Sequence, residues 1–282
     1  MHDAYIKRFL LISVSLLSVL LIACSSAPKG PAPGSPAFNW LAAQDAYKNG
    51  DYVKASDILT QLAKSDNEYS DRARPWALLF SQGLASAYLD LAAKFEQGAK
   101  RNRSNPTPFH KKASEYNSRA VATSLEYVET AHLFLDKNKA KDVTLAMPFP
   151  GGSVEEPAQL KKISVGQPIP DAEMDGVEKE MLKRGVLLAL CKAVDAKGKP
   201  EKAQALFQNG EAKAPGNAFV FALANGLYEV SESFGPKKLD QPHRIKIFFQ
   251  QASEALAMLP PDKNTKDLSK KITDTQKKLR LT

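Results

Sequence analysis

The chain has 282 residues, of which 43% are hydrophobic and 25% charged, with a formal net charge of +8 at pH 7. These values are ordinary for a globular protein and exclude a chain too poor in apolar side chains to bury a sizeable core. The basic residues are interleaved with Asp and Glu, which favours a solvated surface over a groove that binds nucleic acid or another polyanion. Ala, Leu, Lys, Glu and Gln recur throughout and alternating β-branched runs are scarce, so we expect an all-α fold.

The first residues have the features of an export signal. Lys7 and Arg8 precede an uncharged run that extends from Phe9 to Ala23. This run is shorter than the roughly 20 apolar residues that a membrane-spanning helix needs. It ends in Leu21-Ile22-Ala23-Cys24, which resembles the lipobox of bacterial lipoproteins. The other interpretation is a short uncleaved anchor that contains an incidental cysteine.

The lipobox resemblance implies a signal peptide at 1–23, attachment of diacylglycerol to the Cys24 thiol and acylation of the new amino terminus. Several acyl chains, palmitate among them, give a stable membrane anchor. No aspartate follows the cysteine, which favours the outer membrane and a periplasmic location. Residues 24–37 are rich in Ser, Pro and Gly, and we expect a flexible tether before a helical domain at 38–282. With Cys24 lipidated, Cys191 has no intrachain disulfide partner.

Residues 47–59, YKNGDYVKASDIL, resemble the turn and second helix of a tetratricopeptide repeat (TPR). In this comparison Tyr47 packs from the first helix, Gly50 lies in the turn, and Ala55 is the small residue where the two helices approach. The resemblance implies a solenoid of helical hairpins whose concave face holds a peptide or a helix of another protein.

A second segment, residues 188–217, also resembles a TPR unit. Six residues carry the comparison: Leu190 and Cys191 in the first helix, Gly198 in the turn, Ala203 and Phe207 in the second helix, and Pro215 at the end. Residues 219–230 resemble a further first helix, and residues 243–259 its partner beyond an insertion at 231–242. The amphipathic segment 267–282 is expected to form a terminal helix with a polar outer face, and the other interpretation is a helix that binds a membrane surface or nucleic acid.

Two central segments depart from the repeat pattern and predict a long antiparallel helical hairpin. Residues 72–100 and 109–136 each carry aromatic and small residues at helical spacing, which usually marks a buried face. The predicted stripes are Trp76, Phe80, Leu84, Tyr88, Leu91 and Phe95 in the first helix, and Phe109, Ala113, Tyr116, Ala120, Tyr127, Ala131 and Phe134 in the second.

Residues 137–175 contain several prolines and glycines, which exclude a long helix. Residues 143–145 and 163–165 could pair as two short strands. The segment also carries apolar residues, so we expect it to fold back over the helices and shape a cleft.

The sequence contains no recognisable catalytic or metal-binding motif. His110, His132 and His243 are scattered without metal-ligand spacing, and His2 is lost with the signal. Cys191 has apolar neighbours in sequence, which is typical of a buried thiol. Glu178 and Glu180 are interpreted as acids at the start of a helix. A basic cluster from Lys237 to Lys246 is interpreted as a solvated turn, with an anion or acidic-partner contact as the functional alternative.

These observations predict a non-enzymatic, lipid-anchored binding or scaffold protein of the bacterial envelope, with no cofactor and no bound metal. We expect its partner to be a protein or peptide and not a nucleic acid. Two alternatives stay open: a small-ligand-binding lipoprotein accessory to a TRAP-type solute transporter, and an envelope hydrolase with an acidic pair formed only in three dimensions.

Overall fold

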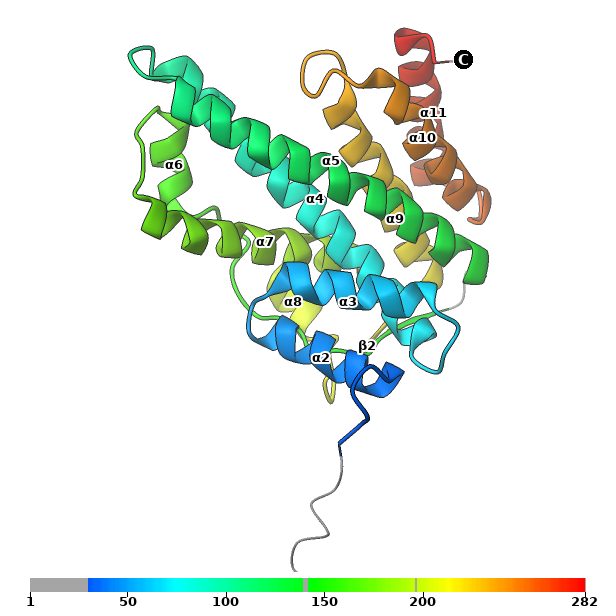
Figure 1. The fold of residues 1–282 in the computed structure, drawn as a ribbon. Helices are drawn as coiled ribbons and strands as arrows, with labels where there is room; N and C mark the ends of the chain where they lie inside the picture. The colour runs from blue at the N-terminus through cyan, green and yellow to red at the C-terminus, as the bar shows by residue number, and fades with distance from the viewer. Residues whose placement is uncertain (1–29, 139–141, 196, 282) are drawn as a thin grey trace, which may run out of the picture.

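The computed structural model describes residues 30–138, 142–195 and 197–281, and the predicted signal peptide and Cys24 lie outside them. The fold is all-α, as the composition predicts, with one small sheet (Figure 1). The helices are α2 (Pro36–Lys48), α3 (Tyr52–Lys64), α4 (Ser70–Arg101), α5 (Thr107–Lys137), α6 (Ala158–Ser164), α7 (Asp171–Ala193), α8 (Pro200–Gln204), α9 (Gly216–Ser231), α10 (Pro242–Ala257) and α11 (Lys263–Leu279), with a 3-10 turn at Glu232–Phe234.

Helices α2 and α3 form the first helical pair. The side chain of Ser35 accepts a hydrogen bond from the Phe38 N–H, and Pro36 occupies the first turn, so the helix begins two residues before the predicted start of the domain at residue 38. Gly50 has φ +74°, a left-handed conformation that costs glycine little, and it turns the chain into α3. Ala55 is fully buried where α3 meets the rest of the domain.

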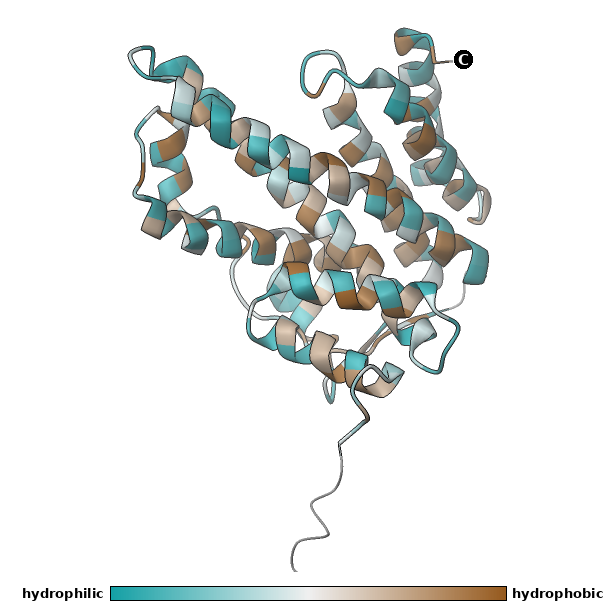
Figure 2. Ribbon diagram, in the orientation of Figure 1, coloured by the Kyte–Doolittle hydropathy of each residue, from teal (hydrophilic) through white to brown (hydrophobic). Residues whose placement is uncertain are grey.

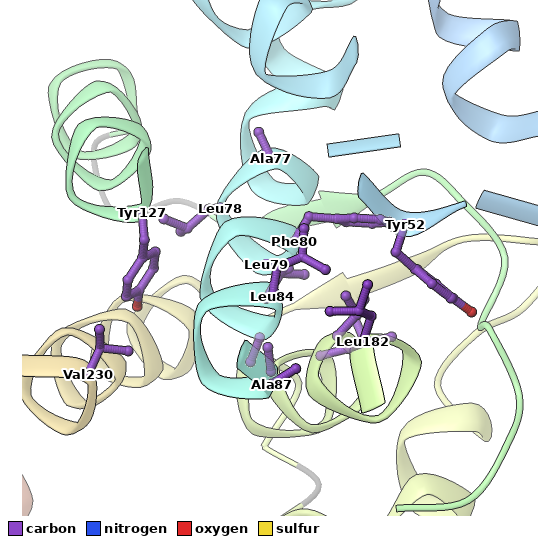
Figure 3. Packing of buried hydrophobic residues seen from close by; sticks show 14 of the residues in the cluster. Tyr52, Ala77, Leu78, Leu79, Phe80, Leu84, Ala87, Tyr127, Leu182 and Val230 are labelled. Carbon is purple, nitrogen blue, oxygen red and sulfur yellow. The ribbon is translucent and has the colours of Figure 1, made fainter. Parts of the chain in front are cut away.

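Helix α4 is the central element of the core. The predicted hairpin is confirmed, because α4 and α5 cover both predicted segments and pack against each other along their length. All residues of the two predicted stripes are buried. Figure 3 shows buried side chains leaving α4 in different directions, with Leu78 toward Tyr127 and Phe80 toward Tyr52. Helices α3, α5 and α7 therefore lie around α4 (Figure 1).

The segment between α5 and α7 folds back over the helices, as expected. The Tyr47 hydroxyl donates to the Pro148 carbonyl at 2.8 Å, and Arg184 Nε donates to the Val154 carbonyl at 2.7 Å. Lys94 pairs with Glu156 at 2.7 Å. The backbone here has no helical ladder to satisfy its carbonyls, so side chains of α2, α4 and α7 hold it in place.

The predicted pairing of residues 143–145 with 163–165 is wrong. Strand β1 (Val143–Leu145) pairs antiparallel with β2 (Ala212–Ala214), with Thr144 opposite Lys213. Residues 163 and 164 end helix α6, whose apolar Leu160 and Ile163 are buried one turn apart. A spacing of three residues between buried side chains suits a helix and not a strand.

The second predicted TPR helix of residues 188–217 is much shorter than expected. Helix α8 ends at Gln204, and Phe207 lies in the following turn, where its ring packs on Phe149 at 5.5 Å between centroids. Asn209 and Gly210 both have positive φ, 53° and 82°, and Gln208 bridges to Glu211. Two such residues in sequence form a tight hairpin turn, and this turn ends the helical path and leads into β2.

Helices α9 and α10 pack against the α4–α5 hairpin, and α11 packs on α10 and α9. Phe249 and Ala252 of α10 are buried, as predicted for their positions. Helix α11 has a capping box at Asp262 and buries Leu268 and Ile272 on one side. Its other side is hydrophilic, and hydrophobic residues gather where helices face one another (Figure 2).

Candidate functional site

A cleft of about 410 Å³ opens between α3, α5 and α7, with α4 as its floor. We call it the α3–α5–α7 cleft. Its lining residues are Val53, Ser56, Asp57, Leu84, Tyr88, Arg119, Ala122, Thr123, Glu126 and Glu178. Val53 is 40% exposed, so an apolar side chain stands free at the rim of this otherwise polar cleft.

Helical periodicity brings these residues together. Arg119, Ala122, Thr123 and Glu126 are spaced three and four apart on α5 and therefore share one face of that helix. The three residues of α3 that line the cleft follow the same spacing. Helices α3 and α5 both bury their opposite faces against α4. The faces that carry the lining residues therefore border the space between α3 and α5.

Arg119 forms the best-connected part of the cleft wall. Its guanidinium pairs with Glu178 of α7 at 2.7 Å and with Glu115 one turn back at 2.7 Å. It also lies 5.8 Å from the ring centroid of Tyr88 and 5.7 Å from that of Tyr116. A planar guanidinium suits both contacts, because it stacks on aromatic faces and donates to carboxylates at its edge.

Glu178 links α7 to the hairpin. Besides Arg119, it accepts a hydrogen bond from the Tyr116 hydroxyl at 3.1 Å. Burial and the Glu178 charge raise the pKa of Tyr116, which keeps that phenol protonated as a donor. Glu178 lies about two turns inside α7, which begins at Asp171, so the interpretation that Glu178 and Glu180 open a helix is wrong. Its charge serves a contact between helices and not the helix dipole.

Asp57 and Glu126 are the other carboxylates of the cleft. Loss of hydration raises the pKa of Glu126, and the charge of Asp57 raises it further; the Thr60 hydroxyl, which donates to Glu126 at 2.7 Å, acts in the opposite direction. The pKa of Asp57 is also raised, by burial first and then by the charge of Asp51. The ionised form of each carboxylate is therefore less well stabilised in the cleft than in water.

Ser56 contributes a buried polar group to the same wall. Its side chain is 1% exposed, and its hydroxyl has no hydrogen-bond partner among the described residues. A buried hydroxyl without a partner costs free energy, and such groups are rare in folded proteins.

The residues singled out for their TPR resemblance lie elsewhere. Tyr47 and Ala55 pack in the α2–α3 region, and Leu190, Cys191 and Ala203 are buried around α7 and α8. Gly198 has φ +73° in the turn between α7 and α8, and Pro215 precedes the first residue of α9. None of these residues lines the cleft. Burial raises the pKa of the Cys191 thiol to about 11, as expected for an inert cysteine.

Sequence reasoning missed three of the four charged residues of the cleft, Asp57, Arg119 and Glu126, and it gave Glu178 a different role. For Arg119 and Glu126 a signal was available, because polar residues at i, i+4 and i+7 (Arg119, Thr123 and Glu126) share one face of α5 outside its hydrophobic stripe. Asp57 and Glu178 come from helices far apart in the sequence, and only the packing of α3 and α7 on α4 brings them near α5.

The segment that follows α5 shapes two further hollows, which confirms that it forms a cleft. One, of about 420 Å³, lies between Pro148–Pro150, the α2–α3 turn and the Lys179–Lys183 stretch of α7. The other, of about 890 Å³, lies beside β1 and is lined by Trp40, Arg72 and Glu211 among others.

Comparison of the chain with protein-family models, with curated proteins and with solved structures gives no significant match. The described ranges contain no group of three or more His, Cys, Asp or Glu side chains that could hold a metal ion. Among the helices described, none is long and apolar enough to cross a membrane.

Proposed function

We propose that the chain is a membrane-anchored, non-enzymatic binding or scaffold lipoprotein of the bacterial envelope, which holds a protein or peptide partner in the α3–α5–α7 cleft. The open cleft itself is the observation that supports this function. It combines an exposed apolar rim at Val53 with Tyr88 and Arg119, and Tyr and Arg are residue types enriched at polypeptide-binding surfaces. The helical pairs α2–α3 and α9–α10 support a TPR-like arrangement.

The anchor proposed for this protein is lipid attached to Cys24. The support is the sequence Leu21-Ile22-Ala23-Cys24 after a short apolar run. The test is Cys24→Ala in the native host, with membrane fractionation and mass measurement of the product. We expect the variant to remain unprocessed and to lose its lipid. Cleavage after Ala23 together with continued membrane attachment would refute the lipoprotein assignment.

The binding function is tested by photo-crosslinking in living cells. A photoreactive amino acid is placed at Ala122, on the rim of the cleft, and in a control chain at Lys270 of α11, away from it. We expect a crosslinked polypeptide of defined mass from position 122 and not from position 270. The same products from both positions would show contact without a specific site, and no product from position 122 would contradict the proposal.

A second candidate function is capture of a small ligand for a TRAP-type solute transporter. It is favoured by the 420 Å³ hollow, where the half-buried Lys183 lies near Tyr52 and Phe149 without an ion-pair partner among the described residues. An ammonium group beside aromatic rings suits an organic anion. Native mass spectrometry of the purified chain tests this candidate, which predicts a co-purified small molecule that is lost in Lys183→Ala.

A further inference from the structure

The charge inside the α3–α5–α7 cleft is opposite to that of the chain. Three carboxylates, those of Asp57, Glu126 and Glu178, line it beside a single guanidinium, that of Arg119. The chain as a whole has a formal net charge of +8. A local excess of negative charge in a concave site raises the concentration of cations there, and it repels anions even though the protein is basic.

The described residues compensate only some of this negative charge. Glu178 forms an ion pair with Arg119 and accepts a hydrogen bond from the Tyr116 hydroxyl. Asp57 and Glu126 have no cation within ion-pair distance among the described residues, although Lys64 lies close enough to influence Glu126. Lys64 itself pairs with Glu129, at 2.9 Å, on the more exposed side of α5. Within the part of the chain that the structure describes, these two carboxylates of the cleft are thus left without an ion-pair partner.

These two carboxylates act on the same space. Asp57 on α3 and Glu126 on α5 line the same hollow, and Thr60, one turn along α3 from Asp57, donates to Glu126 at 2.7 Å. A single cation placed between them would relieve the repulsion and replace the lost hydration of both. Thr60 leaves the remaining lone pairs of Glu126 free for a second donor.

We infer that the α3–α5–α7 cleft recognises a Lys or Arg side chain of its partner polypeptide, with the cationic head held between Asp57 and Glu126. This inference rests on the proposed binding function and names the chemistry of the partner segment. Val53 and Ala122 at the rim supply the apolar surface that the methylene stem of such a side chain covers. Arg119 stays in the wall, where its bonds to Glu178 and Glu115 keep it away from the two free carboxylates.

The test is a binding measurement on the full-length chain in detergent. The probes are four fluorescein-labelled octapeptides with a Gly-Ser background that carry two Lys, two Arg, two Gln or two Glu residues, together with free spermidine as a competitor. The variants are Asp57→Asn and Glu126→Gln. The matched control is Glu129→Gln, which removes the same charge from the same helix at a residue that is 61% exposed and outside the cleft.

We expect the Lys and Arg peptides to bind about tenfold more tightly than the Gln peptide, and each cleft variant to lose about tenfold in affinity. Glu129→Gln should change affinity by less than about twofold. Equal binding of the Gln or Glu peptide would overturn the selectivity for cations and leave polypeptide binding intact. An equal loss in Glu129→Gln would show non-specific attraction and overturn the site. If spermidine binds as tightly as the Lys peptide and loses the same affinity in Asp57→Asn, the cleft recognises a free amine. That result would overturn the inference of a polypeptide side chain.

No binding by any peptide or by spermidine would also overturn the inference. The proposed function would then fail only if crosslinking from position 122 likewise gave no polypeptide product. The two experiments therefore separate a wrong partner chemistry from a wrong function.

Discussion

Gly83 of α4 and Gly185 of α7 face each other where the two helices cross. A Cβ atom on Gly83 would lie 2.5 Å from the backbone nitrogen of Val186, and one on Gly185 would collide with the carbonyl oxygen of Gly83. Two glycines in register let the helix backbones approach more closely than any other residues would allow. This contact seats α7 on α4 and so places Glu178 at the edge of the cleft.

The substitution Gly185→Ala should separate the two helices and destabilise the protein. Overpacking of a rigid backbone contact typically costs about 1–3 kcal/mol, which lowers the melting temperature of a chain this size by about 3–10 °C. The melting temperature is measured by thermal unfolding followed by circular dichroism. The control is Gly176→Ala in the same helix, where nothing lies within 4 Å of the added carbon. There we expect unchanged or slightly higher stability, because Ala is the better helix former; equal losses in both variants would contradict this account of the crossing.

Glu126→Gln should raise stability at neutral pH while it weakens binding. The native pKa of Glu126 is raised above its unfolded value, so the ionised group opposes folding, and this penalty appears as the pH rises from the unfolded pKa through the native one. Below the unfolded pKa both states are protonated, and the penalty vanishes. The amide still accepts from Thr60, so we expect the variant to melt about 1–3 °C higher at pH 7 and no higher at pH 3.5. A lower melting temperature at pH 7 would mean that Glu126 has a structural role.

The Cys191 thiol should be inert in the native protein. It is fully buried, and its pKa of about 11 leaves almost no thiolate at pH 8. Titration with a thiol reagent should give no reaction before guanidinium is added. After unfolding, the processed lipoprotein should release one thiol per chain and an unprocessed chain two, because the sequence contains only Cys24 and Cys191. Rapid labelling without denaturant would show that α7 opens readily.

The turn at Gly210 should tolerate Asn and not Val. Its φ of 82° costs a β-branched residue more than it costs Asn, which adopts left-handed conformations readily. Gly210→Val is expected to lose about 1–2 kcal/mol and Gly210→Asn less than about 0.5 kcal/mol in the free energy of unfolding. Denaturant titration compares the two variants. Hydrogen exchange at the paired residues Val143 and Ala214 should speed up only in the Val variant.

The sequence predicted the long helices well because local patterns determine them. The aromatic, Leu and Ala residues of the two predicted stripes recur three, four or seven positions apart, and every one of them is buried. Strand β1 was placed correctly, but its partner was not. Residues 212–214 carry the short apolar and polar alternation Ala-Lys-Ala, which is too weak a strand signal on its own.

The turn before β2 could have been predicted and was not. Asn209-Gly210 is a strong hairpin signal, yet the TPR resemblance of the flanking residues favoured a continuous helix there. The cleft could not be predicted from sequence alone. Asp57, Glu126 and Glu178 belong to three helices that local patterns cannot orient relative to one another, and the close contact of Gly83 with Gly185 depends on the same packing.

The most direct test of the account is to map where a cationic peptide binds. Backbone amide shifts of the isotope-labelled full-length chain are recorded by nuclear magnetic resonance as the two-lysine octapeptide is added. We predict that the largest shifts occur at Val53, Ala122 and Thr123 on the rim of the α3–α5–α7 cleft. They should disappear in the double variant Asp57→Asn/Glu126→Gln. Shifts centred instead on Lys179 and Lys183, or on α11, would contradict the account.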